Sequence, residues 1–216
     1  MILNIDVVSD VICPWCFVAK RRLEQAIEDV RDRHEFRTAW HPFQLNPAIP
    51  AEGIERRIYR TAKFGSWEHS HALDMRLVEV GKSVGIEFAF DHIQWTPNTF
   101  DAHRLIWLAQ QESVQESVVE ALFHTYFEQG HHIGDRQVLT EIALTSGIDH
   151  ERLMQFWSSD DGSTAVSEEE AAARRLGISS VPYIIINGKY SLSGAQDPQT
   201  IVSAFDQVSQ LTMVEH

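Results

Sequence analysis

Both cysteines of this chain, Cys13 and Cys16, lie in one Cys-Pro-Trp-Cys motif close to the N-terminus. Two thiols separated by two residues can be oxidised to a disulfide and reduced again, so their chemistry is the exchange of thiols and disulfides. The motif directly follows residues 2–8, an apolar run with the composition of a β-strand. A cysteine pair that ends a strand and opens a helix is typical of a redox-active site.

The order of residues within the motif predicts different roles for the two thiols. Pro14 suits the first position of a helix, where a backbone N–H has no helical partner. Cys13 then becomes the N-cap, and its sulfur faces free N–H groups and the positive end of the helix dipole, which favour the nucleophilic thiolate. Cys16 lies one turn further on the same face. We therefore predict that Cys13 attacks and that the more buried Cys16 resolves, while Pro14 and Trp15 add no positive charge.

Two other uses of the cysteine pair fit the sequence less well. A structural zinc site needs four ligands, but the chain has no second cysteine pair, and none of its eleven histidines stands at zinc-finger spacing from Cys13. A purely structural disulfide would close a loop of two residues and would constrain the unfolded chain very little. The sequence therefore favours redox chemistry, and we predict no metal site.

The composition limits the partners and the compartment. The chain has 31 acidic and 18 basic residues, a net charge of −13, which disfavours binding to nucleic acid or to anionic membranes. Hydrophobic residues make up 44%, enough for a folded core. No segment approaches the roughly 20 apolar residues of a membrane-spanning helix, and the N-terminus lacks the pattern of a signal peptide. We therefore expect a cytoplasmic protein, in which a reactive cysteine pair is usually catalytic.

The order of predicted elements indicates an α/β fold. A helix over residues 17–34 and a strand over 36–45 complete a β-α-β unit with the first strand. Helical periodicity then dominates, for example over residues 100–111, up to a helix that a Ser167–Glu170 capping box would begin and Gly177 would end. The sequence Asn187-Gly188 between two β-rich runs predicts a hairpin, and a final helix over 198–211 follows a capping Asp197.

This order predicts a thioredoxin fold with a large all-helical domain inserted between its β-α-β and β-β-α halves. Residues 1–46 and 164–216 would form the thioredoxin-like domain. Residues 47–163 would form the helical insertion domain.

Four blocks of the sequence, in this order, resemble one family. They are Ser9 to Cys16, Pro97 to Leu105, Ser180 to Tyr183, and Asn187 to Tyr190 with Ser193 to Gln196. The chain is similar to the DsbA-like thioredoxin superfamily, in particular to its FrnE-like branch of thiol oxidoreductases. The resemblance implies a protein dithiol–disulfide oxidoreductase or isomerase.

The same resemblance implies roles for four further residues. Pro182 would be a cis proline beside the cysteine pair, and Val181 before it would pair its backbone with the substrate. Asn98 and His103 would face the active site across the domain interface, although His103 could equally be a packing residue of its helix.

A related branch contains the glutathione-dependent 2-hydroxychromene-2-carboxylate isomerases and kappa-class glutathione transferases. The isomerases typically carry serine at the position of Cys13, so the presence of Cys13 and Cys16 favours disulfide exchange. The resemblance implies no tightly bound cofactor. Glutathione is a candidate redox partner or co-substrate. The other partners would be a thiol or disulfide substrate, from a protein or a small molecule, and a recycling thiol system. A glutathione-dependent isomerase or transferase, and a binding protein that has kept the fold, stay open as alternatives.

Overall fold

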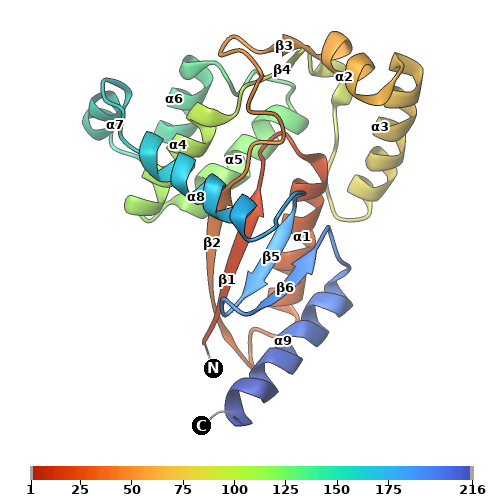
Figure 1. Cartoon of the computed structure of the whole chain (residues 1–216), viewed down its shortest axis with the longest axis vertical. Coiled ribbons are helices and arrows are strands. Elements are labelled where there is room, and N and C mark those ends of the chain that lie inside the picture. Colours follow the sequence, from red (N-terminus) through yellow and green to blue (C-terminus); the bar gives the residue numbers. More distant parts are fainter. Residues whose placement is uncertain (1, 215–216) are drawn as a thin grey trace.

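A four-stranded sheet lies at the centre of the molecule, in the order β2-β1-β5-β6 (Figure 1). The structure is a computed structural model that describes residues 2–214 and the side chains of residues 2–211. The strands of the sheet are β1 (Ile2–Ser9), β2 (Glu35–Pro42), β5 (Tyr183–Ile186) and β6 (Tyr190–Ser193). β1 pairs in parallel with β2 and antiparallel with β5, which pairs antiparallel with β6. The sheet therefore joins the two ends of the sequence.

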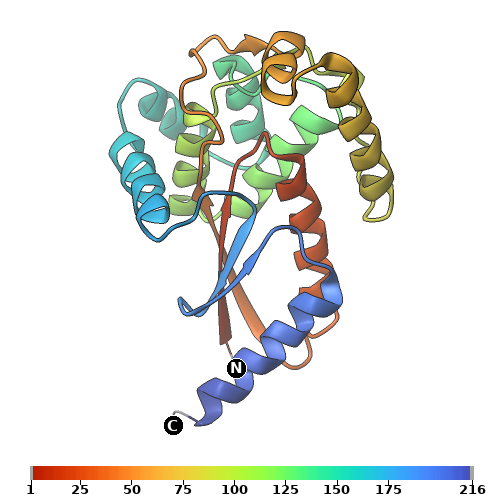
Figure 2. The same cartoon turned by 45° about the vertical axis from the view of Figure 1, so that its right-hand side comes forward.

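Three helices cover this sheet. They are α1 (Pro14–Glu28), α8 (Ser163–Arg175) and α9 (Pro198–Val214). A parallel pair of strands needs a crossover connection, which α1 provides between β1 and β2. Figure 2 shows α1 and α9 on one side of the sheet and α8 on the other. Because both faces are covered, the side chains of Leu3, Ile5 and Val8 in β1 are all buried.

The segment between β2 and α8 is mainly helical. It contains α2 (Arg56–Phe64), α3 (Trp67–Lys82), the 3₁₀ helix η1 (Phe90–His92), α4 (Phe100–Gln111), α5 (Gln115–Phe127), α6 (Arg136–Thr145) and α7 (His150–Trp157). The strands β3 (Ile54–Glu55) and β4 (Trp95–Thr96) pair over two residues each. The fold is therefore the predicted thioredoxin fold with a helical insertion, in which one short β-ladder also occurs.

An aromatic cluster joins α1 to the insertion. The rings of Phe17 in α1 and Phe123 in α5 stack at 5.1 Å between centroids, and Phe88 meets Phe17 edge-on at 6.1 Å. All three side chains are buried. Such ring pairs contribute about 0.5–1.5 kcal/mol beyond the area they bury. They hold the helix that carries the cysteine motif against the insertion.

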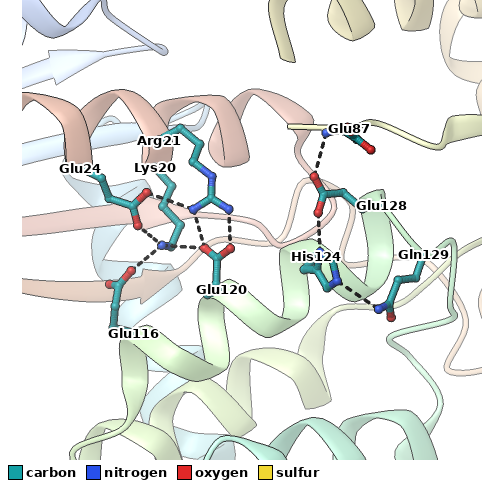
Figure 3. Close-up of polar contacts among 9 residues, drawn as sticks. All are labelled: Lys20, Arg21, Glu24, Glu87, Glu116, Glu120, His124, Glu128 and Gln129. Carbon is teal, nitrogen blue, oxygen red and sulfur yellow. Dashed lines mark hydrogen bonds and ion pairs between the residues drawn. The ribbon is translucent and has the colours of Figure 1, made fainter. Parts of the chain in front are cut away.

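A buried lysine makes a second connection between α1 and α5 (Figure 3). The side chain of Lys20 is 2% exposed, and its Nζ lies 2.6 Å from Glu116 and 2.8 Å from Glu120 and also contacts Glu24. Arg21 binds the carboxylates of Glu24 and Glu120. Burial by itself would lower the pKa of Lys20, but these carboxylates outweigh it and raise the pKa above its ordinary value. Lys20 therefore stays protonated.

Local signals placed the C-terminal hairpin correctly. Asn187 and Gly188 adopt φ values of +51° and +68°, which asparagine and glycine tolerate better than other residues, and they connect β5 to β6. Asp197 accepts a hydrogen bond from the backbone N–H of Thr200 at 3.0 Å, so it caps α9 as predicted.

Two predictions about helix ends were wrong. α1 ends at Glu28 and not at residue 34, because the chain turns through the following residues to reach β2. α8 begins four residues before Ser167, whose hydroxyl donates to the carbonyl of Ser163. Glu170 accepts hydrogen bonds from the backbone of Gln44 and from the side chain of Arg174, so a contact between distant segments replaces the predicted capping box.

Within residues 2–214, no helix has both the length and the apolar character needed to cross a membrane.

Candidate active site

Cys13 and Cys16 stand at the N-terminus of α1, as the sequence predicted. Cys13 is the N-cap with an extended backbone, and Pro14 is the first helical residue. The carbonyl of Cys13 accepts a hydrogen bond from the N–H of Cys16 at 2.9 Å, which closes the first turn. Both cysteines are free thiols in this structure.

The two thiols differ in their surroundings. Cys13 is 5% exposed and Cys16 is 1% exposed. Burial, and then the neighbouring Cys13, raise the pKa of the Cys16 thiol well above its ordinary value. Cys16 is therefore a protonated thiol at neutral pH.

The loop before β5 lies directly against Cys13. The Val181–Pro182 peptide bond is cis, as the family resemblance implied. The Cys13 Sγ lies 3.7 Å from the carbonyl oxygen of Val181, to which the thiol donates. The carbonyl of Pro182 accepts a hydrogen bond from Gly194, so β6 supports this loop.

A fully buried carboxyl group, Asp10, lies between β1 and the motif. The backbone carbonyl oxygen of Asp10 accepts a hydrogen bond from the N–H of Cys13 at 3.0 Å, and its side-chain Oδ2 accepts one from the N–H of Leu45 at 2.8 Å. His103 in α4 places Nε2 3.4 Å from Asp10 Oδ1, and both side chains are shielded from solvent. Asp10 therefore ties the motif to the loop after β2, and its carboxylate lies beside α4.

Asn98 is bound to the chain around it. Its Oδ1 accepts hydrogen bonds from Gln44 Nε2 at 3.3 Å and from the N–H of Phe100 at 2.9 Å, and its Nδ2 donates to the carbonyl of Ile49 at 2.6 Å. The structure therefore places Asn98 as a brace between the loop after β2 and the start of α4.

A cavity of about 450 Å³ opens beside Cys13, between the start of α1 and the helices α2 and α3. This volume is within the range of small-molecule sites. Trp15 stands at its edge with 43% of its surface exposed. Neither Asn98 nor His103 lines the cavity. The lining residues are Ile12, Cys13, Pro14, Trp15, Leu45, Arg56, Tyr59, Arg60, Lys63, Phe64, Leu73, Arg76, Leu77, Val80, Thr96 and Tyr126.

The sequence predicted the cysteine motif but none of the cationic residues that line the cavity beside it. Arg56, Arg60, Lys63 and Arg76 line it, and no acidic residue of the described chain does. A signal was present, because residues 56–63 contain four cations and no acid in a chain of net charge −13. Nothing in the sequence indicated that Asp10 would lie beside the motif, because this depends on its burial in the folded chain.

The part of the chain that the structure describes contains no group of three or more His, Cys, Asp or Glu side chains able to hold a metal ion.

Solved structures share this fold. A probable DsbA oxidoreductase from Streptomyces coelicolor is 27% identical, with a TM-score of 0.87 over 95% of this chain and 89% of that one.

More distant structures share the same fold. A 2-hydroxychromene-2-carboxylate isomerase is 15% identical, with a TM-score of 0.72 over 99% of both chains. The cytosolic disulfide reductase DsbM from Pseudomonas aeruginosa with GSH is 14% identical, with a TM-score of 0.67 over 96% of this chain and 99% of that one. These likenesses show that the fold is shared.

The family model described as the DSBA-like thioredoxin domain matches residues 4–206, nearly the whole chain. The match includes the cysteine motif, the helical insertion and the cis-proline loop. The chain therefore belongs to the family of DSBA-like thioredoxin domains, and its Cys13–Cys16 pair is that of a thiol–disulfide oxidoreductase.

Proposed function

We propose that Cys13 is the nucleophile of this oxidoreductase and Cys16 its resolving thiol. The main support for this proposal is the position of the Cys13 Sγ at the helix N-terminus, beside both the Val181 carbonyl and the cavity. Cys16 lies one turn behind it and is more deeply buried. A substrate can therefore meet Cys13 first.

The reaction has two exchange steps. The thiolate of Cys13 attacks one sulfur of a substrate disulfide, forms a mixed disulfide and releases the other sulfur as a thiolate. Cys16 then attacks the Cys13 sulfur, which forms the Cys13–Cys16 disulfide, and the Cys16 proton passes to the second substrate sulfur, which leaves as a thiol. The substrate gains two electrons and the cysteine pair loses two, and the reverse cycle oxidises a substrate.

The surrounding residues position these groups. Val181 and Pro182 form the surface against which the substrate sulfur lies, and Trp15 offers an exposed ring at the cavity edge. Asp10 holds the loop after β2, His103 lies beside the Asp10 carboxylate, and Asn98 braces the start of α4. The helical insertion, residues 47–163, supplies the far wall of the site.

Glutathione is the recycling thiol in this proposal. A disulfide reductase with GSH among the structural neighbours supports it, and the cytosolic location of that protein supports a cytoplasmic site of action. The substrate is a thiol or disulfide compound. The net charge of −13 argues against nucleic acid as a partner.

A glutathione-dependent isomerase or transferase is the second candidate. The fold shared with the 2-hydroxychromene-2-carboxylate isomerase and the presence of a cavity of small-molecule size favour it. The activity of such an enzyme would require glutathione. Because it needs only one reactive group of the protein, it would survive Cys16→Ser.

The redox equilibrium of the pair distinguishes the two candidates. The full chain is equilibrated in glutathione buffers, and free thiols are then labelled and counted by mass. We expect a single two-electron transition between dithiol and Cys13–Cys16 disulfide, absent in Cys13→Ser, and its potential within about −270 to −120 mV would give the direction of the cycle. A disulfide that never forms, or a stable glutathione adduct on Cys13, would make the second candidate the better one.

A further inference from the structure

The cavity beside Cys13 carries a charge opposite to that of the whole chain. Four cationic residues line it, Arg56, Arg60 and Lys63 from α2 and Arg76 from α3. The nearest compensation is Asp74, which binds Arg56 Nη2 and Arg60 Nη2 at 2.6 Å each. One carboxylate against four cations leaves three positive charges at a cavity in a protein of net charge −13.

One of these cations is buried with an unsatisfied donor. The Arg56 side chain is 6% exposed, and its Nε has no hydrogen-bond partner in the protein. An unpaired buried donor costs about 1–3 kcal/mol, so such atoms are rare unless they serve a purpose. Because Arg56 lines the cavity, a ligand oxygen there could accept this hydrogen bond.

The two outer cations are free to meet a ligand. Lys63 Nζ has the Tyr59 hydroxyl as its hydrogen-bond partner, at 3.3 Å, and lies over the rings of Tyr59 and Phe64. Neither Lys63 nor Arg76 forms an ion pair with any described carboxylate. Both residues are exposed where they line the cavity, and their long, flexible side chains can reach an anion bound there.

Besides the polar side chains of Tyr59, Thr96 and Tyr126, the cavity has an apolar wall. It is formed by side chains from the motif, the loop after β2 and the inner faces of α2 and α3, namely Ile12, Leu45, Phe64, Leu73, Leu77 and Val80. A polar anion alone would leave this surface uncovered, and a neutral apolar compound would leave the cations uncompensated.

We infer that this cavity selects a small organic acid as the disulfide or thiol substrate, with its carboxylate toward Arg56 and Lys63 and an apolar body against the wall. This inference rests on the proposed function, because the sulfur of the compound must reach Cys13. In the first step the Cys13 thiolate attacks one sulfur of the acid's disulfide. The acid becomes bound to Cys13 through a new S–S bond, and its other half leaves as a thiolate.

Two disulfides that differ in charge test the inference. 5,5′-Dithiobis(2-nitrobenzoate) is aromatic and anionic, and 4,4′-dithiodipyridine is aromatic and neutral. The full chain with Cys16→Ser, which keeps a single reactive thiol, is reacted with each, and the second-order rate constants are divided by those of free cysteine. We expect a normalised ratio of anionic to neutral rate constants above one, despite the net charge of −13.

Charge-removing variants then locate the effect. Lys63→Gln and Arg76→Gln should each lower the ratio roughly three- to ten-fold, as expected for the loss of one charge near a partly shielded anion. Arg57→Gln is the matched control, because Arg57 lies on the same helix, changes the net charge equally and does not line the cavity. It should change the ratio by less than about two-fold.

The outcomes separate the two proposals. A ratio that falls equally in Arg57→Gln and in the cavity variants, or one that no variant changes, would overturn the selection of organic acids and leave the exchange chemistry intact. A Cys13 that reacts with neither disulfide faster than free cysteine would count against the proposed function itself.

Discussion

The Sγ atom of Cys13 lies 3.7 Å from the carbonyl oxygen of Val181, a residue 168 positions away in the sequence. This contact joins the start of α1 to the loop before β5, the strand that pairs with β1. The Cys13 thiol therefore stands between a backbone segment on one side and the cavity on the other.

Replacing either cysteine should have a distinct effect. Cys13→Ser should lower disulfide-exchange activity by at least roughly two orders of magnitude, because the nucleophile is lost. Cys16→Ser should instead accumulate mixed disulfides on Cys13, since the resolving thiol is absent. Mass spectrometry without reduction, with the double variant as control, measures both. Failure of Cys16→Ser to trap any substrate would contradict the assigned order of attack.

The carboxyl group of Asp10 should influence the acidity of Cys16. Burial is the main cause of the raised pKa of Cys16, and the negative charge of Asp10 adds to it. Asp10→Asn keeps an oxygen that can accept from Leu45 but removes the charge, so the pKa of Cys16 should fall. The ultraviolet absorbance of the thiolate, followed against pH in a Cys13→Ser background, measures the shift. The exposed Asp32→Asn should leave the titration unchanged, and a rise in Asp10→Asn would refute the assignment.

The buried Lys20 should be important for stability. Lys20→Met removes the cation that three glutamates share, and leaves Glu116 and Glu120 facing each other at the α1–α5 contact. We expect the free energy of unfolding in urea to fall by about 1–3 kcal/mol, less than for a wholly buried pair because the glutamates are partly exposed. The exposed Arg31–Glu28 pair is the control, and Arg31→Gln should cost about 0.5 kcal/mol or less. If Lys20→Met and Arg31→Gln lowered the free energy of unfolding equally, the ion pairs of Lys20 would add no more stability than an exposed pair.

His41 should make stability depend on pH near neutrality. Burial lowers its pKa, but hydrogen bonds with Glu169 and Asp6 outweigh this and raise the pKa above 6.5. The folded chain therefore holds the proton more tightly than the unfolded chain, and the stabilisation is complete below pH 6.5 and lost as the pH rises through the folded value.

The difference in unfolding free energy between wild type and His41→Gln should accordingly shrink from about pH 6 to about pH 8.5. Urea unfolding at both pH values gives this difference. A difference that grows with pH would show that His41 is held neutral and not protonated.

Local signals were sufficient for several features of this protein. Pro14 places the start of α1 and makes Cys13 the N-cap, because proline suits a position without a helical N–H partner. Asn187 and Gly188 place the hairpin, since these residues accept positive φ. Each of these features depends on the conformational preferences of neighbouring residues, which a sequence displays directly.

Signals of the same kind failed where a distant segment competed for the same group. Ser167 and Glu170 have the spacing of a capping box, but Glu170 binds the backbone of Gln44 and the helix begins earlier. The roles of Asn98 and His103 came from the family resemblance and stay predictions: Asn98 binds the loop after β2, His103 lies beside Asp10, and neither lines the cavity. Which partner a polar side chain finds depends on the packing of elements far apart in the chain.

The sequence by itself determined the redox pair, the order of elements and hence the thioredoxin fold with its helical insertion. Only the tertiary structure decided which insertion helices face Cys13, and so brought Arg56 and Arg76 to one cavity. It also decided that Asp10 is buried beside the motif and that Lys20 is enclosed by carboxylates. The physical reason is that burial and charge pairing arise between segments that are separated by many residues, and they exist only once those segments pack together.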